Sequence, residues 1–334
     1  MTQLTNLDII NNVDNYPQHA TNSIACERPE KSHYCLLFED SQGRFSVGFL
    51  VPEVVNALTK LPTELASSIE IDHQNKTVLA FTEPTESERT THVAAIVQHW
   101  QSRQVFKVLK RFRNEMWPVY GRDGVTVLYS IERVAASLFG VNRYGAHLNA
   151  WVRSGDSRGG MKLWIGRRAA DKPTYPRMLD NTAAGGMVTG EDPLECIIRE
   201  ADEEASLPES IMRQNVIPSG FISYIALTSS TREDGGESGL LYPECQWIYD
   251  IELPEGLTPV PKDGEVEAFY LWTVDQVLDQ LHQGNFKPNC GLLLIDFFIR
   301  HGIMTKDNEP DFDEIKARLR RPLPFPGPHE HIQV

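Results

Sequence analysis

Hydrophobic residues recur at helical spacing in the first part of the chain. Between residues 92 and 113, apolar side chains stand mostly three or four positions apart: Val93, Ile96, Val97, Trp100, Val105, Val108, Leu109 and Phe112. This pattern predicts one long amphipathic helix from His92 to about Arg113. A second helix is predicted from about Ile131 to Leu138, because Gly140 follows it and glycine often ends helices. Short apolar runs at 32–39 and 44–51 predict strands that precede both helices.

From His147 onwards, the pattern changes to strands separated by glycine-rich turns. Strands are predicted at 147–152 and 162–168, on either side of a turn at 155–160. A helix is predicted to begin at Asp192, because an acidic N-cap followed by proline is a typical first turn. Later predicted elements are strands at 220–227, 246–253 and 265–272 and helices at 274–282, 289–300 and 313–320. The proline-rich segment after Arg320 predicts a surface tail.

The predicted helix after Asp192 carries an unusual concentration of acid. Residues 191–204 hold seven carboxylates against one base, Arg199. Glu200, Glu203 and Glu204 stand at i, i+3 and i+4, so they project from one face of a helix. Like charges at this spacing repel one another, and hard divalent cations such as Mg²⁺ or Mn²⁺ prefer clustered carboxylate oxygens. The pattern therefore predicts a metal site.

Composition limits the class of protein. The chain has 334 residues, of which 41% are hydrophobic and 23% charged, which is ordinary globular usage and long enough for two domains. The net charge of −14 argues against a nucleic-acid partner, and the apolar runs are too short to span a membrane. The five cysteines form no CxxC pair, and no signal peptide is visible. We therefore expect a cytoplasmic protein in a reducing environment, with neither a disulfide framework nor structural zinc.

Residues 185–207, GGMVTGEDPLECIIREADEEASL, resemble the signature of the Nudix hydrolases. This family cleaves diphosphates linked to another moiety. The resemblance implies an α/β/α sandwich with a mixed sheet, preceded here by a smaller α+β N-terminal domain. Two positions depart from the family pattern: Ser206 replaces the usual glycine, and Ala201 replaces a larger aliphatic residue. Neither is a metal ligand, so we expect only the helix exit and the packing beneath it to differ.

The resemblance also implies roles for individual residues of the signature. The ligands of Mg²⁺ or Mn²⁺ would be the carboxylates of Glu200, Glu203 and Glu204 and the carbonyl of Gly185, supported by Gly186. Arg199 would hold these glutamates by ion pairing, and Glu191 would fix Arg199 from the loop. Cys196 lies inside the helix without an activating histidine near it in the sequence, so we predict that it packs rather than reacts.

The general base remains open at this stage. Glu200 can serve as base in some members of the family, whereas others recruit an acid from a distant loop. Glu265 and Glu267 precede the predicted strand that holds Trp272, and in an extended chain residues two apart share one face. Either could complete the metal site or act as base, and the alternative is that both are surface acids. Glu244 is a third candidate.

Four segments outside the signature, 139–152, 162–186, 286–303 and 321–325, are similar to the thiamin-pyrophosphokinase-related Nudix proteins of fungi and plants. The similarity covers essentially the whole chain, although no kinase domain fits within it. It implies hydrolysis of thiamin diphosphate, or of oxothiamin or oxythiamin diphosphate, to the monophosphate and phosphate. The expected substrate-binding residues are Arg143, Tyr175, Arg177, Asn181, Tyr224 and Trp247.

This resemblance divides the chain into an N-terminal domain at 1–143, a hydrolase domain at 144–305 and a C-terminal helix and tail at 306–334. Two alternatives stay open: the same chemistry on ADP-ribose or NADH, and a non-catalytic sensor that binds a diphosphate ligand. The intact glutamates argue against the sensor. A further feature is a basic segment that comprises Lys107, Lys110, Arg111 and Arg113. It is either a solvated face near a helix end or a docking patch for a phosphate or a partner.

Overall fold

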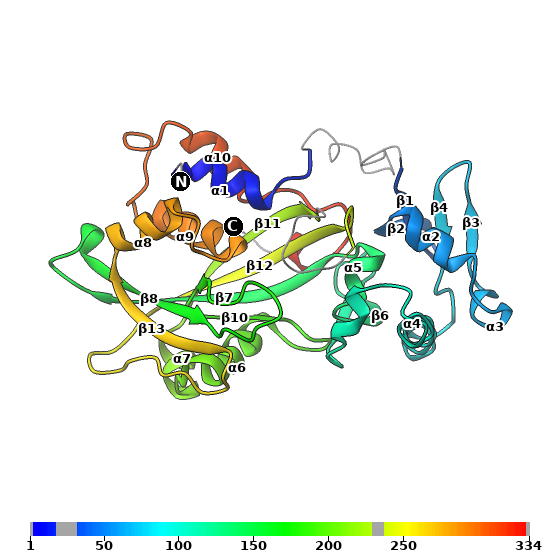
Figure 1. The fold of residues 1–334 in the computed structure, drawn as a ribbon, viewed down its shortest axis with the longest axis horizontal. Coiled ribbons are helices and arrows are strands. Elements are labelled where there is room, and N and C mark those ends of the chain that lie inside the picture. Colours follow the sequence, from blue (N-terminus) through cyan, green and yellow to red (C-terminus); the bar gives the residue numbers. More distant parts are fainter. Residues whose placement is uncertain (1–2, 18–31, 229–236, 332–334) are drawn as a thin grey trace.

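The computed structural model describes residues 3–17, 32–228 and 237–331 (Figure 1). The N-terminal part, residues 32–142, contains a four-stranded sheet of order β2-β1-β4-β3 and a two-stranded hairpin of β5 and β6. Its elements are β1 (Tyr34–Asp40), β2 (Gly43–Leu50), α2 (Pro52–Leu58), α3 (Thr63–Ala66), β3 (Glu70–Asp72), β4 (Thr77–Leu79), α4 (Glu86–Ser102), η2 (Val108–Arg111), β5 (Met116–Tyr120), β6 (Val127–Glu132) and α5 (Ala136–Phe139). One hydrophobic core joins the sheet, α4 and the hairpin.

Two helix predictions in this part are wrong in their extent. Helix α4 ends at Ser102 instead of about Arg113, because the chain turns through Gln104, whose φ of 54° is left-handed, and continues as the short η2. The helix expected at 131–138 is much shorter: residues 131–132 end strand β6, residues 133–135 form a turn, and only Ala136–Phe139 is helical. Pairing with β5 keeps Ile131 and Glu132 in the hairpin, and tertiary contacts of this kind override a weak local pattern. Gly140 ends the helix in the left-handed conformation as predicted.

The C-terminal part, residues 143–331, is built on a seven-stranded sheet of order β11-β12-β7-β8-β13, with β10 beside β7 and β9 beside β8. Strands β12 and β7 run parallel, and the other pairs are antiparallel. The elements are β7 (Arg143–Arg153), η3 (Arg158–Gly160), β8 (Met161–Arg168), β9 (Leu179–Asp180), β10 (Ala183–Gly186), α6 (Pro193–Ala205), α7 (Glu209–Asn215), β11 (Ile217–Leu227), β12 (Leu241–Glu252), β13 (Val266–Thr273), α8 (Val274–His282), α9 (Pro288–Arg300), α10 (Phe312–Arg318) and η4 (Pro328–His331).

Helices cover both faces of this sheet. Helices α6 and α7 lie on one face and α8 and α9 on the other (Figure 1), and each face has its own hydrophobic core. The predicted α/β/α sandwich with a mixed sheet, preceded by a part made of strands and helices, is therefore confirmed. Helix α1 (Asn6–Val13), which the sequence did not predict, buries Ile9, Ile10 and Val13 in the core that contains α8 and α9.

The C-terminal segment does not form the predicted surface tail. Phe325 is buried, and its carbonyl accepts a hydrogen bond of 2.8 Å from the side chain of Asn142. A second correction concerns the cysteines: Cys35 is disulfide-bonded, whereas Cys196, Cys245 and Cys290 are free and buried. Within the described ranges, the helices are too short or too polar to cross a lipid bilayer.

Candidate active site

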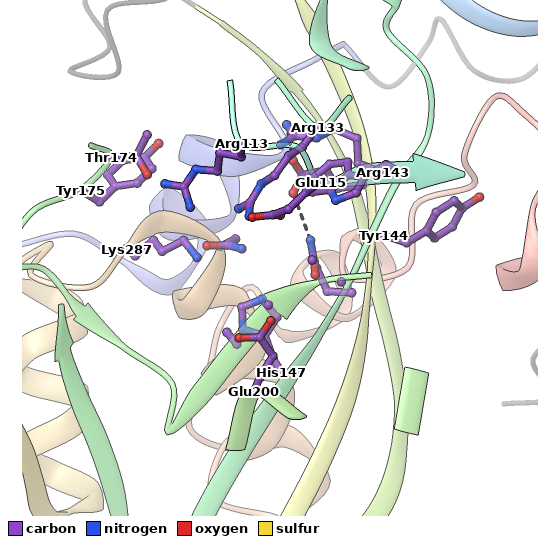
Figure 2. A pocket seen from close by; sticks show the side chains of 18 of the residues that line it. Arg113, Glu115, Arg133, Arg143, Tyr144, His147, Thr174, Tyr175, Glu200 and Lys287 are labelled. Carbon is purple, nitrogen blue, oxygen red and sulfur yellow. Dashed lines mark hydrogen bonds and ion pairs between the residues drawn. The ribbon is translucent and has the colours of Figure 1, made fainter. Parts of the chain in front are cut away.

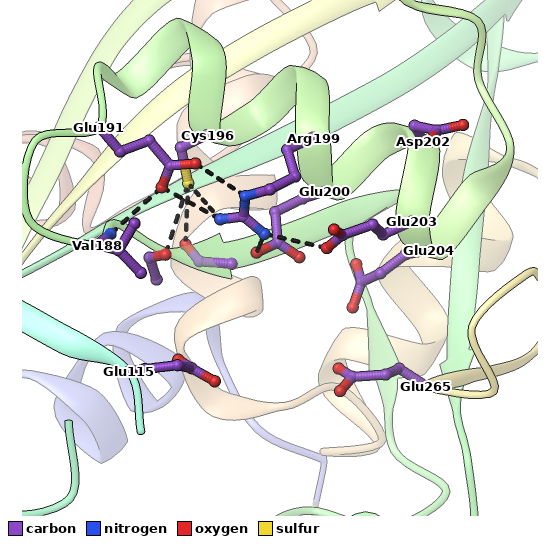
Figure 3. A network of polar contacts seen from close by, with 12 residues as sticks. Glu115, Val188, Glu191, Cys196, Arg199, Glu200, Asp202, Glu203, Glu204 and Glu265 are labelled. Carbon is purple, nitrogen blue, oxygen red and sulfur yellow. Dashed lines mark hydrogen bonds and ion pairs between the residues drawn. The ribbon is translucent and has the colours of Figure 1, made fainter. Parts of the chain in front are cut away.

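Helix α6 separates a packed side from an acidic side (Figure 3). Asp192 caps its first turn by accepting a 2.8 Å hydrogen bond from the amide of Leu194. The packed side consists of Cys196, Ile197, Ile198, Ala201 and Ala205, all buried. The helix ends at Ser206, whose φ of 53° lies in the left-handed region usual for glycine. Its hydroxyl donates to the carbonyl of Val260 at 2.9 Å, so serine keeps the helix exit of the family with one added hydrogen bond.

Arg199 bridges three carboxylates. Its guanidinium donates two hydrogen bonds to Glu191, at 2.8 and 3.1 Å, one to Glu200 at 2.7 Å and one to Glu203 at 3.0 Å. Glu191 also accepts from the amide of Val188 at 3.2 Å, which ties the preceding loop to the helix. Hydrogen bonding to Glu191 raises the pKa of Arg199. The arginine therefore stays charged and fixes the relative positions of the acids.

Gly185 makes the close approach of strand and helix possible. It lies on β10, paired with Ala146 of β7, directly beneath Glu200. A Cβ at position 185 would fall 1.8 Å from Oε1 of Glu200, so no larger residue fits while this carboxylate keeps its place. The sequence therefore needs glycine here for contact with the acidic helix.

The acids of this site are held in an environment that disfavours their charge. Burial raises the pKa of Glu200 and raises that of Glu204 still more, and the two carboxylates also repel each other. Among the described residues, the Glu204 carboxylate accepts one hydrogen bond, from the amide of Ala184 at 2.9 Å. A buried pair of carboxylates with spare oxygens suits a hard divalent cation, which removes the repulsion and uses those oxygens.

A second group of potential ligands lies nearby but fits such a cation less well. His147, Asp180 and Cys290 offer ligand atoms within 4.8 Å of one another. However, Asp180 is already ion-paired with Arg168 at 2.9 Å and with Lys287 at 3.8 Å, and the Cys290 thiol donates to it at 2.7 Å. Two neighbouring cations oppose the entry of a third, so this group is better described as a buried ion-pair network.

A cavity of about 470 Å³ lies between the two parts of the protein, in front of the acidic helix (Figure 2). The C-terminal part lines it with Gly185, Gly186, Arg199, Glu200, Glu203 and Glu204, and also with His147, Lys172, Tyr175, Tyr224, Glu265 and Lys287. The N-terminal part lines it with Val108, Arg111, Arg113, Glu115, Trp117, Arg133, Val134 and Ser137. The volume falls in the range usual for small-molecule sites.

Three of the six residues expected to bind substrate line this cavity: Arg143, Tyr175 and Tyr224. Arg143 is ion-paired with Glu244 at 2.8 Å and lies over the ring of Trp117 at 4.9 Å, so its charge is already matched. The other three do not line the cavity: Arg177 is exposed, Asn181 is buried in hydrogen bonds to His147 and Asn149, and Trp247 belongs to the core beneath α6.

Glu265 and Glu267 do not share a face. Glu265 lines the cavity and is ion-paired with Lys172, whereas Glu267 is exposed and lies outside it. The reason is a register shift between Val266 and Ala268, where β13 pairs with β8, because such an irregularity breaks the two-residue alternation of a strand. Figure 3 shows Glu265 and Glu115 facing α6 from the opposite side.

Comparison with known families agrees with this geometry. Residues 145–290 match the model described as NUDIX domain. The chain therefore contains a Nudix domain. Residues 19–143 of this Nudix protein match a domain of unknown function, DUF4743. The enzyme prediction is confirmed: the chain is a hydrolase that acts on pyrophosphate bonds.

Relatives share both parts of the chain. An uncharacterized protein of Saccharomyces cerevisiae, YJR142W, is 32% identical over 84% of this chain and 82% of its own length. Nudix hydrolase 20, chloroplastic, of Arabidopsis thaliana is 35% identical over 70% of this chain, and the match spans 58% of the plant protein. Among solved structures, DR0079 of Deinococcus radiodurans aligns with 62% of this chain and 100% of its own, with 20% identity and a TM-score of 0.34.

Sequence analysis missed several residues that line the cavity. No local pattern marks Trp117, Lys172 or Lys287 as a site residue, and only the folded chain brings them to the cavity beside Glu200. Arg113 had a signal, since the basic segment allowed a phosphate-docking patch as one of its two interpretations.

Proposed function

We propose that this Nudix hydrolase is dependent on Mg²⁺ and converts thiamin diphosphate-like molecules, preferably the oxothiamin and oxythiamin forms, to the monophosphate and phosphate. The observation that carries the proposal is the position of Glu200, Glu203, Glu204 and Gly185 on one wall of a closed-in cavity of about 470 Å³. An all-oxygen donor set would then lie beside a space large enough for a small organic diphosphate, which supports the proposal.

The carboxylates of Glu200, Glu203 and Glu204 and the carbonyl of Gly185 would hold the Mg²⁺. When bound, the ion neutralises charge on the phosphate oxygens and activates water. Glu265, across the cavity, is the favoured proton acceptor for the attacking water. Although burial acts to raise the pKa of Glu265, the ion pair with Lys172 lowers it overall, so this carboxylate is ionised at neutral pH.

The walls around the organic part of the ligand favour a neutral ring. Aromatic side chains line this region: Trp117, Tyr144, Tyr175, Tyr224 and Tyr242. Two of the acids that line the cavity are each matched by an arginine, Glu115 by Arg133 at 2.7 Å and Glu244 by Arg143 at 2.8 Å. Neither of these two carboxylates is free to pair with a positively charged thiazolium, whereas oxidation of the ring removes that charge. This supports a preference for the oxidised forms.

The same donor set would also cleave ADP-ribose or NADH, because the signature fixes the bond and not the group attached to it. Aromatic walls suit an adenine ring as well as a pyrimidine. An activity assay with both classes of substrate is therefore needed to distinguish thiamin diphosphates from ADP-ribose and NADH.

The decisive experiment measures release of phosphate or monophosphate with Mg²⁺ from thiamin diphosphate, oxothiamin diphosphate, oxythiamin diphosphate, ADP-ribose and NADH. Wild type is compared with Glu203→Gln, Glu265→Gln and the matched surface control Glu267→Gln. We expect the highest kcat/KM with the oxidised thiamin forms, a loss of roughly 100-fold or more in the first two variants, and no change in the control. A preference for ADP-ribose or NADH would overturn the substrate assignment and keep the reaction.

A further inference from the structure

The N-terminal part is attached directly to the loop that precedes the acidic helix. Thr189, in that loop, donates its amide to the carbonyl of Met116 at 2.8 Å and its hydroxyl to Ser130 at 2.9 Å. Trp117 packs on Gly186, where a Cβ would come within 2.7 Å of the indole. The β5–β6 hairpin is therefore held in a fixed position relative to the signature residues, and side chains on it can act in the same site.

Most cations that line the cavity already have an anionic partner. Arg133, Arg143, Arg168, Lys172, Arg199 and Lys287 each have a carboxylate within ion-pair distance. Arg111 and Arg113 line the same cavity, yet within the described ranges neither guanidinium has a recorded hydrogen bond or ion pair. Both are only partly exposed. The charge of Arg113 also acts on the Glu265 carboxylate, whose direct ion-pair partner is Lys172. Two cations without a direct ion pair in a semi-enclosed space attract an anionic ligand.

The backbone at Arg113 is fixed by a buried acid. Glu132 accepts hydrogen bonds from the amide of Arg113 at 2.8 Å and, through its other oxygen, from the amide of Val134 at 2.7 Å. The next residue, Asn114, has a left-handed φ of 61°, which turns the chain into β5. Figure 2 shows the Arg113 side chain entering the cavity from the N-terminal part, on the side opposite Glu200. The scaffold thus presents the guanidinium to the space in front of the glutamates.

We propose that Arg113 is a substrate-binding residue which the N-terminal domain supplies to the hydrolase site, where it binds the diphosphate from the side opposite Glu200, Glu203 and Glu204. This inference rests on the proposed diphosphate hydrolysis but not on the thiamin moiety. The inference gives the N-terminal domain a function. The Nudix domain supplies all the proposed metal ligands, and the N-terminal domain adds a residue that binds the phosphate. An arginine fits the task because its planar guanidinium forms paired hydrogen bonds with phosphate oxygens.

The test compares Arg113→Ala and Arg113→Lys with Lys110→Ala, which removes an exposed charge three residues earlier that does not line the cavity. Two quantities are measured with Mg²⁺: KM and kcat for the best substrate, and the Kd of methylenediphosphonate by calorimetry. We expect Arg113→Ala to raise KM and this Kd by roughly 10- to 100-fold, Arg113→Lys to recover part of the loss, and Lys110→Ala to match wild type. Thermal unfolding checks that each variant is folded.

The two proposals fail in different ways. If wild type hydrolyses thiamin diphosphates and Arg113→Ala keeps their KM and the Kd of methylenediphosphonate, the Arg113 inference is wrong and the substrate assignment stands. If wild type hydrolyses no thiamin compound, yet methylenediphosphonate binding weakens in Arg113→Ala only, the substrate assignment is wrong and Arg113 keeps its role. The inference is also wrong if Lys110→Ala weakens KM and the Kd of methylenediphosphonate as much as Arg113→Ala does, because the effect would then come from net charge. It is wrong as well if wild type does not bind methylenediphosphonate.

Discussion

Trp117 of the N-terminal domain lies against Gly186 of the Nudix domain so closely that a Cβ at position 186 would approach Cζ2 of the indole to 2.7 Å. Gly186 follows the expected metal ligand Gly185, so the contact joins the two domains at the active site itself. Trp117 is buried, and Arg143 lies over its ring at 4.9 Å. The position of the glycine pair therefore depends on packing from a domain that the signature does not include.

Coupling between these two positions is the first prediction. Gly186→Ala pushes the indole away, so it lowers both kcat/KM and the free energy of unfolding, the latter by roughly 1–3 kcal/mol. Trp117→Phe makes room, and it loses no hydrogen bond, since the indole N–H has no partner among the described residues. In urea unfolding, the double variant is expected to lose less free energy of unfolding than the two single variants lose together, by about 0.5–3 kcal/mol. Strict additivity would show that the contact is not structural.

Gly185→Ala is expected to lower kcat strongly without unfolding the protein. The added Cβ would fall 1.8 Å from Oε1 of Glu200, the far end of a side chain, so the carboxylate moves and the backbone does not. Displacing a ligand by about 1 Å costs on the order of 100-fold in kcat. The matched control is Gly155→Ala, whose Cβ meets nothing within 4 Å. A fall in melting temperature that parallels the loss of activity would contradict this explanation.

Substitutions of Ser206, at the end of helix α6, are expected to change stability and not activity. Ser206 has a φ of 53° and donates a hydrogen bond to Val260. Ser206→Ala keeps the left-handed backbone and loses the bond, so the free energy of unfolding falls by about 1 kcal/mol. Ser206→Gly also loses the bond but relieves the strain, so it is more stable than the alanine variant by about 1 kcal/mol. Denaturant unfolding orders the variants, and kcat should be unchanged in both.

A pH-dependent contribution to stability is expected from His329. Burial, aided by the charge of His331, lowers the pKa of His329 to about 4 from its ordinary value of 6.5, and its ring lies 3.3 Å from the hydroxyl of Tyr144. A histidine with a depressed pKa stabilises the fold above about pH 6.5, and this contribution is lost as the pH falls towards 4.

The measurement compares wild type with His329→Gln, because carboxylates titrate over part of the same range in both proteins. Melting temperature is recorded at intervals from pH 7.5 to pH 4.5. We expect the difference between the two proteins to change through this window, with wild type losing more stability than the variant. Parallel curves would mean that His329 is not held neutral by the fold.

The sequence by itself determined the reaction class and the acidic side of the site. Fixed spacing in one helix is enough to place Glu200, Glu203 and Glu204 on a common face, and the resemblance to the Nudix signature adds Gly185 to them. The layered architecture followed from the resemblance to the Nudix hydrolases, because strand and helix periodicities show which side of each element is buried but not how the elements pack together. The structure agrees with these predictions since they depend on residues close together in the chain.

Only the tertiary structure decided which residues share the cavity. Glu265 enters it and Glu267 does not, because a register shift in β13 breaks the expected alternation. Trp117 and Arg113 reach the site because the β5–β6 hairpin docks on the loop at Thr189, a contact between residues that lie more than seventy positions apart in the chain. Such contacts are set by packing and hydrogen bonds across domains, for which a local pattern of residues carries no information.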